Sequence, residues 1–131
     1  MWKKECGQFC REIHYKRKEE GIEITGCFGE DGQIVLPDEI EGLPVISIAP
    51  YAFAEAKTDP DDLIWRNKEV PDIKVDRHAQ EKAERICAEQ VESVWLPKGV
   101  TEIGRYAFYR CRNLKTLILS DSLLEIGGGA F

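Results

Sequence analysis

The C-terminal part of the sequence repeats itself, and this repeat restricts the possible folds more than any other feature. Val91 aligns with Leu114 at a shift of 23 residues, and the apolar positions that follow match in kind. The matched pairs are Val91 and Leu114, Val94 and Leu117, Leu96 and Leu119, Val100 and Leu123, Ile103 and Ile126, Gly104 and Gly127, Ala107 and Ala130, and Phe108 and Phe131. A fixed period of about 20 to 29 residues is typical of stacked coils that cannot bury their apolar faces alone.

Each coil begins with a short alternating segment, "SVWLP" or "TLILS". Alternation at every second residue predicts a strand, with Val94 pointing inward and Trp95 pointing outward. Pro97 ends this strand because proline cannot donate to a ladder. We expect Gly104 to let the backbone turn, before a short helical turn that buries Phe108.

An earlier coil is present at residues 31–56, in "IVLPDEIEGLPVISIAPYAF". It keeps the strand and the proline, contains five additional residues, and ends on Tyr-Ala-Phe like the second coil. Ala52 and Ala107 lie 55 positions apart, and 55 minus 23 leaves 32 residues that one repeat does not explain. The sequence therefore predicts coils at 31–56, 91–113 and 114–131, the last of them incomplete, with an insertion at 57–90.

These coils resemble the BspA-like, bacterial surface-antigen type of leucine-rich repeats, whose units read approximately LxxIxIPxxVxxIGxxAFxxC. The resemblance covers about half of the chain, with Ser120 in place of the proline and Ala56 in place of the cysteine at 111. It implies an α/β repeat fold, a short right-handed leucine-rich-repeat solenoid. It also implies a protein that is exposed at the cell surface or secreted and takes part in adhesion or protein interaction.

The segments outside the coils predict a cap and a decorated insertion within a single domain, 1–131. Residues 5–28 are expected to form an N-terminal β-hairpin cap, with Ile13 and Tyr15 on one face and "KEEG" as the turn. In the insertion, "LIW" at 63–65 is a possible anchor onto the body, followed by a helix at about 76–90 with apolar residues on one stripe. The cap is expected because an open coil exposes apolar side chains and unpaired strand edges.

Composition excludes several kinds of partner. The 18 basic and 24 acidic residues give a net charge of -6, which disfavours nucleic acid, and "HYKRK" at 14–18 is expected to be a solvated turn. No apolar run is long enough to insert into a membrane. The first residues do not read as a signal peptide, so the chain as written is expected in the cytoplasm, against the surface or secreted location that the resemblance implies.

No metal, cofactor or catalytic motif is expected. Cys6, Cys10 and His14 recur every four residues, with Cys27 as a further candidate zinc ligand, but along a strand this spacing separates them by about 13 Å. The odd number of cysteines favours free, partly buried thiols. The acidic segment "DPDDLIWRNKEV" lacks the glycine and the final glutamate of a calcium loop, so it is expected to be a solvated loop. Both histidines are expected at the surface. We therefore predict that the protein is not an enzyme.

The candidate functional site is the outward side of the strands. Val35, Trp95 and Ile118 are predicted to form an exposed column, flanked by Ser93 and Thr116, and the partner would be a protein of unknown identity. Such columns also occur as ordinary sheet stabilisation. The alternative function is a structural end-piece that forms a homodimer through its incomplete third coil, where Leu117, Leu119, Leu123, Ile126 and Phe131 lack a following coil.

Overall fold

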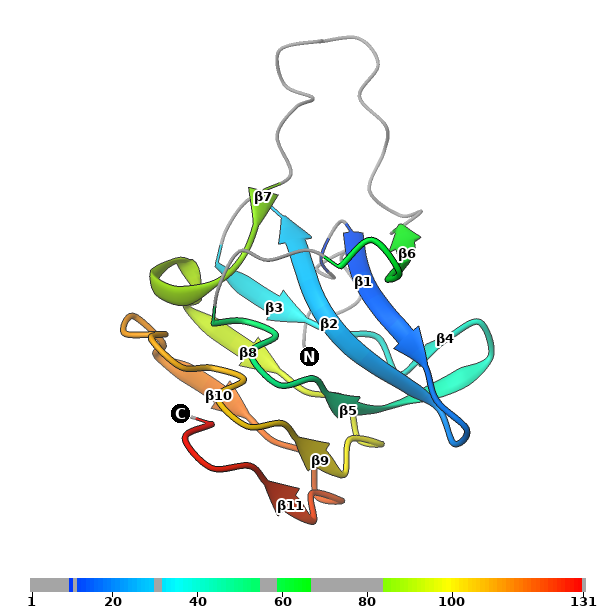
Figure 1. The fold of residues 1–131 in the computed structure, drawn as a ribbon. Coiled ribbons are helices and arrows are strands. Elements are labelled where there is room, and N and C mark those ends of the chain that lie inside the picture. Colours follow the sequence, from blue (N-terminus) through cyan, green and yellow to red (C-terminus); the bar gives the residue numbers. More distant parts are fainter. Residues whose placement is uncertain (1–9, 11, 30–31, 55–58, 67–83, 131) are drawn as a thin grey trace, which may run out of the picture.

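The computed structural model describes residues 10, 12–29, 32–54, 59–66 and 84–130. These residues form eleven short strands and one 3-10 turn, which Figure 1 shows stacked one below another. No α-helix occurs in these ranges, so the expectation of an α/β class is wrong for the part of the chain that is described. The "YAFYRC" segment also forms turns rather than a helix.

The predicted N-terminal hairpin is confirmed. Strand β1 (Glu12–Arg17) pairs antiparallel with β2 (Ile22–Gly29), and Lys18 N–H donates to Gly21 O at 2.7 Å across the turn. The register shifts between His14 and Tyr15, where a bulge breaks the strict alternation of faces. As a result Ile13, His14 and Tyr15 are all buried. Apart from Cys10, the part of the cap before β1 lies outside the described residues.

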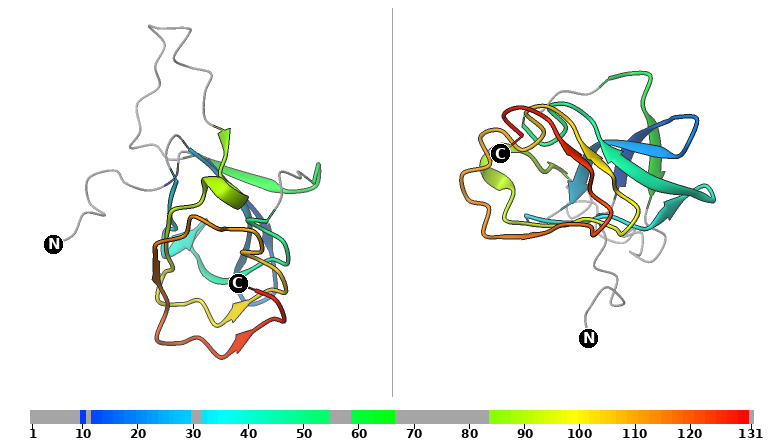
Figure 2. Two further views of the ribbon diagram at one scale, coloured as in Figure 1. Left: turned by 90° about the vertical axis from the view of Figure 1, so that its left-hand side faces the viewer. Right: turned by 90° about the horizontal axis from the view of Figure 1, so that it is seen from below.

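Two parallel ladders carry the coils. The first contains β2, β5 (Leu43–Ile48), β9 (Glu102–Ile103) and β11 (Glu125–Ile126), and the second contains β3 (Gln33–Val35), β8 (Ser93–Trp95) and β10 (Thr116–Ile118). Figures 1 and 2 show the hairpin at one end of the stack and β11 at the other. The core lies between the ladders, where Phe53 and Phe108 stack with their centroids 5.1 Å apart.

The Tyr-Ala-Phe segments bond to each other from coil to coil. Phe53 N–H donates to Ala107 O at 2.8 Å, and Phe108 N–H donates to Ala130 O at 2.8 Å. The residue before alanine adopts a left-handed conformation in all three coils, with φ of 60° at Tyr51, 54° at Tyr106 and 68° at Gly129. The same backbone turn is therefore made with tyrosine twice and with glycine once.

The glycines at the shared repeat position, Gly104 and Gly127, have a different role from the one the sequence suggested. Neither residue has a positive φ; instead, a Cβ on Gly104 would lie 2.5 Å from Pro50 N, and one on Gly127 would lie 2.5 Å from Arg105 N. These glycines allow successive coils to approach backbone to backbone.

The five additional residues of the first coil form a small hairpin. Strand β4 (Glu39–Ile40) pairs with β5 across Glu41 and Gly42, which have φ of 59° and 81°. Two consecutive positive φ values are typical of a type I′ turn. The Glu41 carboxylate returns to the cap, where it accepts a hydrogen bond from the Tyr15 hydroxyl and pairs with Arg17 at 3.1 Å.

The insertion begins and ends on the cap. Strand β6 (Leu63–Arg66) pairs antiparallel with β1, which places the predicted "LIW" anchor on the hairpin. Strand β7 (Glu84–Arg85) pairs with the end of β2, and a 3-10 turn follows at Ala88–Gln90. The helix expected at about 76–90 is therefore wrong for residues 84–90, where pairing with β2 takes the backbone; its earlier residues lie outside the described ranges.

Candidate functional site

The three strands of the second ladder bring the predicted site residues into register. Val35, Trp95 and Ile118 are direct neighbours, and Gln33, Ser93 and Thr116 are direct neighbours two residues earlier. Between these rows, Ile34 and Val94 are fully buried, as inward residues of an alternating strand should be. The register of the three strands is thus the one that the repeat predicted.

The exposure of this column differs from the prediction. Val35 is buried, with 2% of its surface exposed, Trp95 is half-buried, and Ile118 is 43% exposed. The accessible part of the site therefore consists of Trp95, Ile118 and the polar row of Ser93 and Thr116. An indole and an isoleucine beside hydroxyl groups offer apolar contact area and adjacent hydrogen-bond donors, a composition suited to a protein partner.

Ser120 shows how a departure from the repeat is accommodated beside this face. Its hydroxyl lies 2.9 Å from Val100 O, to which it can donate, and it accepts a hydrogen bond from Ser122 N–H at 2.9 Å. The serine therefore ties the third coil to the second where the second coil has a proline. The contact lies just beyond the end of β10, so the third coil stays attached to the second after the strand pairing has ended.

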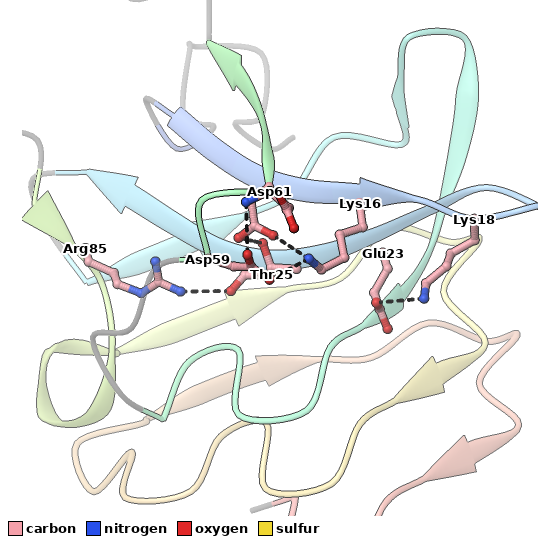
Figure 3. A network of polar contacts seen from close by, with 8 residues as sticks. Lys16, Lys18, Glu23, Thr25, Asp59, Asp61 and Arg85 are labelled. Atoms are coloured by element: carbon pink, nitrogen blue, oxygen red, sulfur yellow. Dashed lines mark hydrogen bonds and ion pairs between the residues drawn. The ribbon is translucent and has the colours of Figure 1, made fainter.

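A second concave region lies between the cap, the first coil and the insertion. It is a cavity of about 530 Å³ whose lining includes Thr25 of β2, the Ala49–Ala52 turn, and Asp59 and Asp62 of the insertion. Figure 3 shows Lys16 beside Asp59, where its Nζ lies 2.9 Å from Asp59 Oδ2. The same Nζ lies 3.0 Å from Asp62 Oδ1. This volume is in the range of small-ligand sites.

The acidic segment that opens the insertion is consequently not simply a solvated loop. The Asp62 side chain is only 3% exposed and accepts a hydrogen bond from the Thr25 hydroxyl at 2.8 Å. Hydrogen bonds to Asp59 and then to Asp62 raise the pKa of Lys16, and the same contact with Lys16 lowers the pKa of Asp59. The aspartates that resembled a calcium loop instead hold the insertion on the cap.

The basic run at 14–18 is likewise paired rather than free in solvent. Its residues lie on β1 and the start of the turn, where Arg17 pairs with Glu41 and Lys18 pairs with Glu23 at 3.3 Å. Every cation of the run has a carboxylate neighbour, so the run offers no uncompensated positive surface. The sequence contained no signal for the pairs of Lys16 and Arg17, because their partners Asp59, Asp62 and Glu41 are far along the chain.

Arg85 crosses β2 beside the cavity. Its guanidinium donates to Thr25 O at 2.9 Å and lies 5.5 Å from the centre of the Phe28 ring. A Cβ at Gly26 would lie 2.4 Å from this guanidinium, so glycine makes room for the arginine. Arg85 thereby joins the returning end of the insertion to the cap.

The histidine and thiols considered as metal ligands occupy other roles. His14 is buried, contrary to the surface position expected, and its ring packs 4.6 Å from Phe28 while Nε2 lies 3.0 Å from Glu12. Cys10, Cys27, Cys87 and Cys111 are free thiols. Within the described ranges no group of three or more histidine, cysteine, aspartate or glutamate side chains could hold a metal ion, and Cys6 lies outside those ranges.

Burial keeps two of these thiols protonated. It raises the pKa of Cys27 well above its ordinary value and that of Cys111 to about 11. A protonated thiol is a weak nucleophile, and Cys111 instead donates to Phe53 O at 3.5 Å, a contact between coils.

The described part of the chain has no helix of the length and hydrophobicity needed to cross a membrane.

Comparison with known proteins agrees with the repeat. Residues 85–131 match the family described as BspA type Leucine rich repeat region (6 copies). Among solved structures, the crystal structure of T. pallidum Leucine Rich Repeat protein (TpLRR) is similar, with 28% identity and a TM-score of 0.59. The similarity covers 87% of this chain and 39% of the T. pallidum protein, so this chain spans well under half of that protein's length.

No curated protein sequence gives a significant match. The resemblance inferred from the repeat is nevertheless confirmed by both the family match and the solved relative, and the fold is that of leucine-rich repeats.

Proposed function

We propose that this chain, whose residues 85–131 are leucine-rich repeats of the BspA type, is a non-enzymatic protein-binding module for protein interaction or adhesion. In this proposal its coils form a short right-handed solenoid, and the partner binds the outward side of the β3–β8–β10 ladder. The observation that supports it is the column in which Trp95 and Ile118 lie in register with partial exposure beside Ser93 and Thr116.

The chemistry of the face favours binding rather than catalysis. Tryptophan is enriched among residues that dominate interface energies, and a flat ladder presents it without mobile loops. The face has polar hydroxyl groups but no charged side chain within β8 or β10, whose sequences are Ser-Val-Trp and Thr-Leu-Ile. A partner would therefore meet it with an apolar group surrounded by hydrogen-bonding groups.

The test is the binding of partners captured from the native source to a set of purified variants. Trp95→Ala and Ile118→Ala should each weaken binding by about tenfold or more, the loss expected of a central interface residue. Ile64→Ala is the matched control, because Ile64 is 47% exposed on β6, outside this ladder. Unchanged binding of every captured partner to Trp95→Ala, with circular dichroism showing an intact fold, would reject the proposal.

A second candidate function is self-association through the third coil. Leu124 is 84% exposed, Ile126 49% and Leu119 40%, so three large apolar side chains are accessible at one end of the stack. Strands β10 and β11 are also the last strands of their ladders among the described residues, with backbone groups available for pairing. A second copy meeting this end would cover both features.

Light scattering during size-exclusion chromatography tests self-association directly. We expect the mass to rise with protein concentration for the wild type and to stay monomeric for Leu124→Ser with Ile126→Ser. A wild-type protein that remains monomeric at high concentration would refute this candidate function without affecting the strand-face proposal.

A further inference from the structure

Three tyrosines form a continuous row on the turn side of the coils. Tyr51 stacks on Tyr106 with centroids 5.3 Å apart, and Tyr106 meets Tyr109 edge to face at 5.4 Å. Tyr51 and Tyr109 are each 44% exposed, and Tyr106 is partly exposed. We call these residues the tyrosine row; they lie beyond the ends of β5 and β9, on the ladder opposite to Trp95.

The row carries a local positive charge. Residues 104–114 contain Arg105, Arg110 and Arg112 and no carboxylate, in a chain whose net charge is -6. Arg110 lies with its guanidinium carbon 5.4 Å from the centre of the Tyr109 ring, and Arg112 lies 3.8 Å from Glu89. Arg105 and Arg110 are exposed, and no described carboxylate is within ion-pair distance of either.

Backbone strain is concentrated in the same place. Among the described residues, five that are not glycine have positive φ, and three of them are Tyr51, Tyr106 and Arg110, the last at 70°. A left-handed conformation is unfavourable for an ordinary residue because its Cβ crowds the following carbonyl oxygen, and glycine avoids this contact. The third coil has Gly129 at the position of the two tyrosines, so glycine is compatible with this turn.

Positions where the chain keeps large side chains despite local strain are associated with binding sites. We propose that the tyrosine row with Arg105 and Arg110 is a second docking surface, distinct from the strand face, that binds an acidic segment of a partner protein. Exposed tyrosine and arginine side chains are the residues that supply most interface energy, and the two guanidinium groups complement carboxylates.

The cavity beside the row provides depth for such a segment. Tyr51 belongs to the row and also lines the cavity of about 530 Å³, together with its neighbour Pro50, and the cavity continues to Lys16 and Thr25. A peptide lying across the three rings could therefore place one side chain into the cavity while its carboxylates meet the arginines. This combination of a flat aromatic surface with an adjoining pocket favours a protein segment over a free small anion.

The experiment selects random displayed peptides on the folded wild-type protein and measures the affinity of the enriched peptides for defined variants. We expect the enriched peptides to be net acidic. Arg110→Glu and Tyr109→Ala should each weaken them by about tenfold or more, whereas Tyr109→Phe, which keeps the ring, should retain binding. Lys98→Glu is the matched control, because Lys98 is also exposed and the change in charge is the same.

Arg110→Gly separates a binding role from a structural one. Glycine relieves the positive φ, so this variant should melt at a higher temperature than the wild type and still bind the acidic peptides more weakly. Trp95→Ala should leave peptide affinity unchanged, which keeps this result independent of the strand-face proposal.

Three outcomes would overturn the inference. The first is enrichment of peptides without net acidic charge, and the second is affinity that is insensitive to Arg110→Glu and Tyr109→Ala. The third is binding of single-stranded DNA as tightly as the best peptide, which would point to a nucleic-acid surface instead.

Discussion

At the scale of single residues, the stack depends on a glycine in each of the last two coils. Gly104 N–H donates to Ile48 O at 2.8 Å and Gly127 N–H donates to Ile103 O at 2.7 Å, so each glycine bonds to the coil before it. The short distance between these backbones leaves no room for a side chain, since a Cβ on residue 104 would lie only 2.5 Å from Pro50 N.

Gly104→Ala should therefore destabilise the protein by about 1 to 3 kcal/mol, the usual cost of forcing a methyl group into a packed site. Gly128→Ala is the matched control, because a Cβ there would meet nothing within 4 Å. Its effect should stay within about 0.5 kcal/mol. Urea unfolding followed by circular dichroism measures both, and equal midpoints for the two variants would contradict the close-approach explanation.

Tyr15 is the residue whose titration should report on the cap. Burial and the hydrogen bond to Glu41 raise its pKa to about 12 from the ordinary value of 10.0. Because the folded pKa is the higher one, this contribution to stability is complete below pH 10 and is lost as the pH rises toward 12. The phenolate absorbance of the wild type minus that of Tyr15→Phe should therefore appear only at the alkaline end of this window. A difference spectrum that is complete by pH 10 would contradict the buried geometry.

At the scale of elements, the insertion is an extension of the cap rather than a separate decoration. Strand β6 adds to the sheet beside β1, and β7 pairs with β2. The ion pairs of Lys16 with Asp59 and Asp62 hold the opening end of the insertion on the hairpin, and Arg85 holds its returning end through Thr25 O. The buried carboxylate of Asp62 is central to this junction, since it contacts both Lys16 and Thr25.

Asp62→Ala should lower the free energy of unfolding by about 1 to 3 kcal/mol, because it removes the acceptor of a hydrogen bond at a site that is closed to solvent. Asp61→Ala changes an exposed carboxylate one residue away and keeps the backbone N–H that donates to Asp59 at 2.9 Å. The control should be close to wild type in chemical denaturation. Similar losses in both variants would mean that general charge, not the Asp62 contact, supports the junction.

The elements also show what a sequence of this kind reveals about its fold. The repeat of 23 residues and the hairpin were predictable, because apolar spacing and turn residues are local signals that the coils and the cap both use. The register of Trp95 between Val35 and Ile118 followed from the same repeat.

Other features required contacts between distant segments. Residues 84–90 have a helical pattern, but Ile86 N–H donates to Cys27 O at 2.9 Å and Ala88 N–H donates to Phe53 O at 2.8 Å, so tertiary pairing overrides propensity. Three further features depend on partners that spacing does not identify. They are the burial of Val35, the bulge at His14, and the ion pairs of Lys16 with the two aspartates of the insertion.

At the scale of the whole molecule, stability should decrease from the cap toward the third coil. Isoleucine at the same place in successive coils is 1% exposed at position 48, 0% at 103 and 49% at 126. The third coil is covered on one side only among the described residues, and segments with few buried contacts open at lower free energy than the core.

Two amides allow this gradient to be measured without differences in local chemistry. Gly104 N–H and Gly127 N–H each follow an isoleucine and donate to the preceding coil at 2.8 and 2.7 Å. Hydrogen exchange followed by NMR should show slower exchange at Gly104 than at Gly127 in dilute protein, because opening the third coil does not expose the second. Equal protection at low concentration would contradict independent opening of the last coil. Protection at Gly127 that rises with concentration, while Gly104 stays constant, would show that a second copy covers the exposed leucines and would support the self-association candidate.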